Sequence, residues 1–172
     1  MFLEPVETMS DHPQQHIKYF WEDLPVGTTL DIGSTTVDRD EVIAFASKYD
    51  PQPFHLDEAA AAKSMFGKLS ASGWHTCAMA MGLMVRGFLH ESSSLGSPGL
   101  EKVSWLTPVY PGDTLTLKQT ILESRPMKSR PDVGLTRTLW EMFNQHGEQV
   151  LMMDGYGMFR RRTPAPADSA SK

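Results

Sequence analysis

Asp50 and His55 are the two side chains in this sequence whose types and spacing best suit acid–base chemistry. They lie in residues 49–57 (YDPQPFHLD), where Pro51 and Pro53 each fix one backbone dihedral angle. The connection is therefore stiff and holds a carboxylate and an imidazole in a reproducible relation. Histidine is the side chain most easily tuned to exchange a proton near neutral pH, and burial would shift the pKa of both groups. The segment is thus a candidate site of proton transfer.

The same residues also have a purely structural interpretation. Asp57 can cap a following helix, Asp50 can close a preceding one, and His55 can be a satisfied polar residue. An aspartate this close before a histidine is too common to decide the matter. Spacing alone leaves both interpretations open.

Turn and capping signals predict the elements that must position this segment. Residues 28–37 alternate weakly after a Pro-Val-Gly turn and predict a strand. Asp38, followed by Glu41, predicts the start of a helix that must end before Pro51.

Two further helices are predicted downstream. Asp57 caps a short alanine-rich helix over residues 58–66, which Gly67 closes. Residues 74–89 (WHTCAMAMGLMVRGFL) are apolar almost all the way round, so we expect a helix that is buried on most of its surface.

The rest of the chain reads as an antiparallel meander. We expect a loop at residues 124–134, another at 92–99 and a hairpin turn at 145–148. The expected strands cover residues 103–109, 114–123, 135–144 and 149–160. This order predicts an α+β fold in which an antiparallel sheet wraps around a long central helix. We expect one domain over residues 19–162, a flexible segment at 1–18 and a disordered tail at 163–172.

Composition argues against several classes of partner. The formal net charge of −5 disfavours a nucleic acid held by phosphate contacts, and no run of about 18 apolar residues suggests a membrane span. A single cysteine, Cys77, cannot form an internal disulfide. Because the first residues also lack the pattern of a signal peptide, we expect a cytoplasmic protein. A basic cluster could meet a phosphorylated cofactor or be a solvated loop; its members are Arg125, Lys128, Arg130 and Arg137.

Three segments, in matching order, resemble the MaoC-like dehydratases, the family of (R)-specific enoyl-CoA hydratases. Residues 50–55 (DPQPFH) resemble the family's D-x-N-P-x-H motif, and residues 66–75 (FGKLSASGWH) resemble its F-G…A-H-G-M region. Residues 105–113 (WLTPVYPGD) resemble its W/F-x-x-P-V-x-P-G-D-T segment. The resemblance extends over roughly residues 19–162 and is far more specific than any one motif.

This resemblance implies a hot-dog fold, a dimer with its substrate tunnel at or near the interface, and an acyl-CoA substrate. Asp50 and His55 would activate water, and the backbone near Ser72 and Gly73 would face the thioester carbonyl. The reaction would hydrate a trans-2-enoyl-CoA or dehydrate a 3-hydroxyacyl-CoA. That chemistry requires two proton-handling groups and one oxyanion site, and we expect neither a metal nor another cofactor.

Three departures from the family pattern surround the pair. Gln52 replaces asparagine, Ser72 replaces histidine and Trp74 replaces methionine. We therefore expect Gln52, Ser72, Gly73 and Trp74 to be substrate-binding residues, although Trp74 has the alternative of anchoring the helix in the core. His75 and Cys77 are expected to be structural.

Two other functions stay open for a hot-dog domain. One is an acyl-CoA thioesterase that uses a carboxylate and water. The other is a non-catalytic acyl-CoA-binding or scaffolding domain, against which the presence of both Asp50 and His55 argues.

Overall fold

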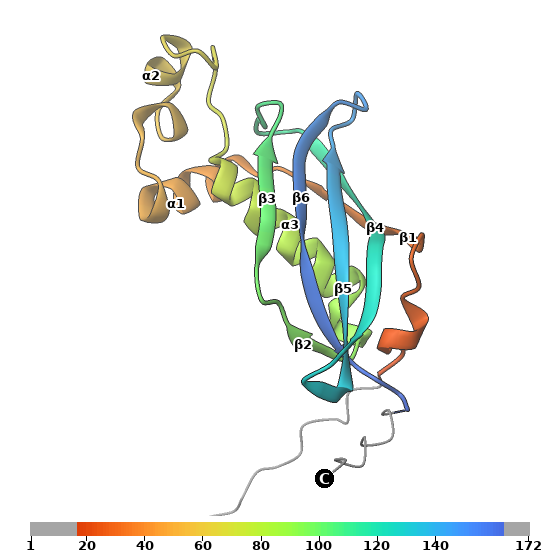
Figure 1. Ribbon diagram of the computed structural model, residues 1–172. Helices are drawn as coiled ribbons and strands as arrows, with labels where there is room; N and C mark the ends of the chain where they lie inside the picture. The colour runs from red at the N-terminus through yellow and green to blue at the C-terminus, as the bar shows by residue number, and fades with distance from the viewer. Residues whose placement is uncertain (1–16, 164–172) are drawn as a thin grey trace, which may run out of the picture.

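Six antiparallel strands form one sheet that curves around helix α3 in the computed structural model, which describes residues 17–163 (Figure 1). The strands are β1 (Thr29–Thr36), β2 (Ser94–Gly96), β3 (Leu100–Trp105), β4 (Thr114–Met127), β5 (Arg130–Phe143) and β6 (Gln149–Arg160). Their order is β1-β4-β5-β6-β2, and β3 also pairs with β6. The predicted α+β arrangement of a sheet around a central helix is confirmed.

Three α-helices accompany the sheet: α1 (Arg39–Tyr49), α2 (Glu58–Ala62) and α3 (Gly73–Gly87). The predicted cap of α1 is confirmed, because the Asp38 carboxylate accepts the Glu41 N–H at 2.9 Å. Figure 1 shows α1 and α2 to one side of the sheet, with the start of α3 between α1 and the strands. Across residues 17–163, no helix is long and apolar enough to cross a membrane.

Helix α2 is shorter than its sequence predicts. The prediction of residues 58–66 was wrong at its end, since the helix stops at Ala62. The Ser64 hydroxyl bonds back to the Ala61 carbonyl, which replaces the next helical turn. Phe66 then lies against Phe54, with ring centroids 5.2 Å apart.

Helix α3 packs one side onto the concave face of the sheet. Its Ala80, Leu83 and Met84 are buried in the core. The expectation that α3 is buried on most of its surface was wrong for the single chain, because Met81 and Val85 are 51% and 42% exposed. An apolar stripe of α3 therefore faces away from the sheet.

The predicted loop at residues 124–134 is instead a continuation of β4 and β5 into a long hairpin. Pro126 is tolerated there because the strand register shifts between Pro126 and Met127. The expected loop at 92–99 likewise contains the short strand β2. The turn predicted at residues 145–148 is confirmed by the bond from the Asn144 N–H to the Glu148 carbonyl.

The basic cluster lies on this long hairpin rather than on a loop. The Arg137 guanidinium contacts Asp154 at 2.7 Å and Glu123 at 3.0 Å, and Arg130 pairs with Asp132 at 3.0 Å. The carboxylates beside Arg137 raise its pKa above the usual range. Two of the four cations are thus already engaged by neighbouring acids.

The predicted chain ends, residues 1–18 and 163–172, lie outside the described residues except at Ile17, Lys18 and Thr163. The backbone N–H groups of Lys18 and Tyr19 both bond to the Glu91 carbonyl, at 2.7 and 3.1 Å. The folded part of the chain therefore includes Lys18.

Candidate active site

A chain of short backbone turns fixes the segment that carries Asp50 and His55. Asp50 closes α1, and its N–H bonds to the Ala46 carbonyl at 2.9 Å. The Gln52 N–H then bonds to the Asp50 carbonyl at 2.7 Å, and the His55 N–H to the Gln52 carbonyl at 2.9 Å. Prolines at positions 51 and 53 restrict the same backbone. The two side chains are therefore held by covalent and hydrogen-bonded constraints together.

Two hydrogen-bond donors clamp the Asp50 carboxylate. The Ser72 hydroxyl donates to Oδ2 at 2.6 Å, and the Gln52 amide Nε2 donates to Oδ1 at 2.7 Å. The Ser72 bond is the largest cause that lowers the pKa of Asp50, with smaller contributions from Gln52 and from the charge of His55, while burial opposes them. Asp50 is thus an ionised carboxylate at neutral pH.

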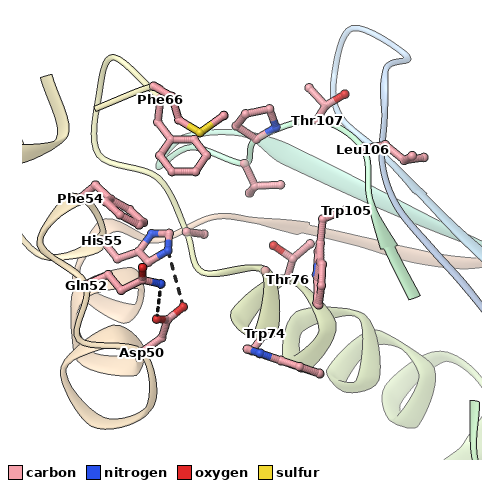
Figure 2. Close-up of a pocket in the computed structure, with 15 residues that line it drawn as sticks. Asp50, Gln52, Phe54, His55, Phe66, Trp74, Thr76, Trp105, Leu106 and Thr107 are labelled. Carbon is pink, nitrogen blue, oxygen red and sulfur yellow. Dashed lines mark hydrogen bonds and ion pairs between the residues drawn. The ribbon is translucent and has the colours of Figure 1, made fainter. Parts of the chain in front are cut away.

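His55 is buried, with 5% of its surface exposed, and its ring orientation is fixed from behind. Its Nδ1 lies 2.7 Å from the Ser70 carbonyl oxygen. Because a carbonyl can only accept, Nδ1 carries a hydrogen and Nε2 is directed toward Asp50. The distance from Nε2 to Asp50 Oδ2 is 3.6 Å, within ion-pair range and beyond a direct hydrogen bond (Figure 2).

The N-terminus of α3 lies beside this pair. Ser72 caps the helix, and its hydroxyl accepts the Trp74 N–H at 3.2 Å. Gly73 is the first helical residue, so its N–H has no partner within the helix. A side chain at Gly73 would place Cβ only 2.6 Å from the Trp105 Nε1, which explains the glycine. The helix dipole and this N–H favour negative charge at the site.

These groups open onto a pocket of about 460 Å³. Figure 2 shows Asp50, Gln52 and His55 on one side, with Trp74 and Trp105 across from them. The two indole rings meet edge to face, with centroids 5.2 Å apart. The remaining lining residues are Phe54, Met65, Phe66, Ala71, Gly73, Thr76, Leu106, Thr107, Pro108 and Val109. The pocket thus offers an acid–base pair, the N-terminus of α3 and apolar walls.

All the site residues predicted from the sequence gather here, in different ways. Asp50, Gln52, His55, Gly73 and Trp74 line the pocket. Ser72 is instead buried behind it and acts on Asp50.

Two residues that contribute to the site were not predicted from the sequence. Ser70 acts through its backbone carbonyl, a group that every residue type carries, so no sequence signal could identify it. Trp105 occurs in the third family-like segment, which offered a signal, but no role was assigned to it.

The two residues expected to be structural, His75 and Cys77, are not among the residues that line the pocket of the acid–base pair. His75 is buried and stacks on Phe45, with ring centroids 4.8 Å apart, and burial lowers its pKa. Burial also raises the pKa of the Cys77 thiol. Within residues 17–163, no group of three or more His, Cys, Asp or Glu side chains has the arrangement of a metal site.

Comparisons relate the chain to known proteins. The family described as "MaoC like domain" matches residues 23–141. The crystal structure of the MaoC-like dehydratase from Rhodospirillum rubrum is 41% identical, has a TM-score of 0.80, and is matched over 85% of this chain and 99% of that one. Neighbours of this kind confirm the hot-dog fold.

Two curated proteins also match over most of their length. The 3-hydroxybutyryl-CoA dehydratase of Methylorubrum extorquens is 28% identical over 144 residues, which are 81% of this chain and 86% of that protein. Uncharacterized protein YdeM of Bacillus subtilis is 27% identical over 134 residues, which are 78% of this chain and 92% of that protein. The similarity therefore extends across most of the chain.

Proposed function

Since the chain belongs to the MaoC-like dehydratase family, we propose that it is a hydro-lyase acting on acyl-CoA thioesters. It adds water to the double bond of a trans-2-enoyl-CoA, or eliminates water from a 3-hydroxyacyl-CoA. The similarity to a 3-hydroxybutyryl-CoA dehydratase supports this reaction class. The observation that carries the proposal is the 3.6 Å separation of His55 Nε2 and Asp50 Oδ2 at the wall of the pocket.

The reacting water binds between these two atoms. It donates one O–H to Nε2 of His55 and the other to Oδ2 of Asp50. As the water oxygen attacks C3 of the enoyl group, Nε2 takes its proton, and the imidazolium then delivers that proton to C2. The double bond becomes a C3–O bond and a C2–H bond, with no proton gained or lost. Asp50 stays ionised, orients the water and stabilises the imidazolium.

The start of α3 supplies the electrostatic stabilisation. Negative charge grows on the thioester carbonyl oxygen during the attack, and preorganised N–H donors lower the energy of that state. Gly73 lines the pocket, and its N–H lacks a partner within the helix. We assign it as the donor to the carbonyl oxygen.

The other predicted residues support the pair and shape the pocket. Ser72 and Gln52 hold Asp50 in its ionised form and in one orientation. Trp74, which is 59% exposed, forms a wall against which the acyl group rests. Action without a cofactor and a cytoplasmic location stay predictions from the sequence.

A second copy of the chain is the expected partner. Trp74, Met81 and Val85 form an exposed apolar stripe along α3, and Leu100 and Trp105 of β3 are about half exposed beside it. Strand β3 pairs with β6 at one of its edges, which leaves its other edge available for a strand of a second copy. We infer a homodimer, or a higher assembly of dimers, that buries this surface.

The test uses purified protein with no added cofactor and a panel of short, medium, branched and dicarboxylic enoyl-CoAs. Hydration removes the conjugated absorbance of the enoyl group and leaves the thioester intact. A thioesterase would instead release free CoA, which a thiol reagent detects. Binding without either signal would identify a non-catalytic domain and would overturn the proposal.

A further inference from the structure

Gln119 is a polar residue on the buried face of β4, where the neighbouring side chains are apolar. Leu115, Leu117 and Ile121 alternate with it on the buried face of the strand. Gln119 is itself only 2% exposed. A buried amide is costly unless its donors and its acceptor are all paired, so this residue requires an explanation.

The orientation of the Gln119 amide is set by Trp140, its partner across the strands. The indole Nε1 of Trp140 donates to Gln119 Oε1 at 3.2 Å. Because an indole N–H can only donate, the oxygen must face it and the Nε2 group must point elsewhere. Within the described part of the chain, Nε2 is buried and has no hydrogen-bond partner.

The unpartnered Nε2 belongs to a residue that lines a second, largely apolar chamber of about 420 Å³. Figure 1 shows α3 running along the curved sheet, and residues of both elements line the chamber. Gly157 of β6 is among them, and a Cβ there would lie 2.9 Å from the Phe159 ring, which also lines the chamber. Trp74 lines both this chamber and the pocket of Asp50 and His55, so the two spaces adjoin.

We propose that this chamber binds the distal part of the acyl chain, and that Gln119 Nε2 donates a hydrogen bond to a neutral oxygen on that chain. The preferred substrates are enoyl thioesters whose acyl chain carries a ketone, ether or hydroxyl oxygen, rather than plain hydrocarbon chains. A carboxylate is disfavoured, because the described residues of the lining include no Lys, Arg or His to neutralise it. This proposal rests on the proposed function, since the adjoining pocket must hold the thioester.

The test compares enoyl-CoAs of equal length, in which one chain carbon is replaced by an ether oxygen at successive positions beyond the double bond. For the wild type, the best-placed oxygen should raise kcat/KM over the hydrocarbon by about tenfold to a hundredfold. Gln119→Met removes the donor at nearly constant length and should bring this ratio close to one. Gln119→Leu removes both the donor and the acceptor of the amide and should also abolish the preference.

Dissociation constants of the matching saturated acyl-CoAs separate this proposal from the proposed reaction. If no enoyl-CoA is hydrated but the wild type still binds the ether chain more tightly, the reaction assignment fails and the chamber stands. Equal affinities and equal kcat/KM values at every oxygen position would overturn the role of Gln119 and would leave an ordered water as the partner of its amide. Thermal unfolding checks both variants, and if Gln119→Met does not fold, Gln119→Leu decides the outcome.

Discussion

The Ser72 hydroxyl donates a 2.6 Å hydrogen bond to Oδ2 of Asp50, across 22 positions of the chain. The same hydroxyl accepts the Trp74 N–H and so caps α3. One oxygen atom thus joins the start of the central helix to the ionisation of the proposed catalytic carboxylate. The family pattern has histidine where this chain has Ser72. A hydroxyl, smaller than an imidazole, therefore donates the hydrogen bond here.

Replacing Ser72 with alanine should raise the pKa of Asp50. Because the Ser72 bond lowers that pKa, its loss lets the carboxylate become protonated at a higher pH. An NMR titration of the Asp50 carboxyl carbon measures this pKa directly, which kcat/KM does not, since His55 also exchanges protons in the proposed mechanism. Loss of the cap should also destabilise the fold by about 1 kcal/mol. Ser72→Thr retains the hydroxyl and serves as the control; an unchanged Asp50 titration in Ser72→Ala would contradict the role of the bond.

Replacing Gln52 with methionine should also raise the pKa of Asp50, but by less than replacing Ser72. Gln52 also lowers the pKa of Asp50, but through a lesser contribution than Ser72. The pKa of Asp50, measured by the same NMR titration, should rise less than in Ser72→Ala, and thermal stability should change little because Gln52 is exposed. Gln52→Glu is the matched charge control, since it places a second carboxylate beside Asp50 and should raise that pKa further. A larger shift in Gln52→Met than in Ser72→Ala would reverse the assigned order of the two donors.

The sequence allowed the local features of the site to be predicted well. Pro51, Pro53 and the cap at Asp38 act on residues close in the chain, and their consequences are visible without a fold. Ser70 and Trp105 could not be assigned, because a backbone carbonyl leaves no trace in residue type and the Trp105–Gly73 contact depends on tertiary packing.

Errors in the predicted elements have the same origin. Residues 124–134 were predicted to form a loop, whereas β4 and β5 continue through them and a register shift lets β4 pass Pro126. The apolar character of α3 predicted burial on most of its surface, although Met81 and Val85 are exposed in the single chain. The hydrophobic pattern indicates that a surface is buried, but it does not indicate whether the same chain or a second chain buries it.

Asp50→Asn and His55→Gln should each abolish most of the activity while the fold persists. Asparagine keeps the size of Asp50 but removes its charge, and glutamine removes the proton-accepting nitrogen of His55. Each change should lower kcat by about 10² to 10⁴, the range that general acid–base groups contribute. The loss of enoyl absorbance measures turnover, and circular dichroism monitors the fold. Near-normal hydration by either variant would remove that residue from the proposed mechanism.

Gly73→Ala should impair the reaction through Trp105. The new Cβ would lie 2.6 Å from the Trp105 Nε1, so the indole must move within the pocket that it lines. We expect a lower kcat, because the ring is displaced near the proposed carbonyl donor. The double variant Gly73→Ala/Trp105→Ala removes the clash and should recover part of kcat relative to Gly73→Ala alone. The double variant should approach the level of Trp105→Ala; if it is no more active than Gly73→Ala, the steric explanation is wrong.

Val85→Glu should dissociate the proposed homodimer without unfolding the chain. Val85 is 42% exposed in the single chain and lies one helical turn from Met81, which is 51% exposed. A carboxylate there is solvated in a monomer but would be buried without a partner in an interface formed by this stripe. Sedimentation equilibrium should show a dimer for the wild type and a monomer for Val85→Glu. Lys63→Glu is the matched control and should remain dimeric, because Lys63 is exposed and follows α2, outside the apolar stripe of α3. A dimeric Val85→Glu would place the interface elsewhere on the molecule.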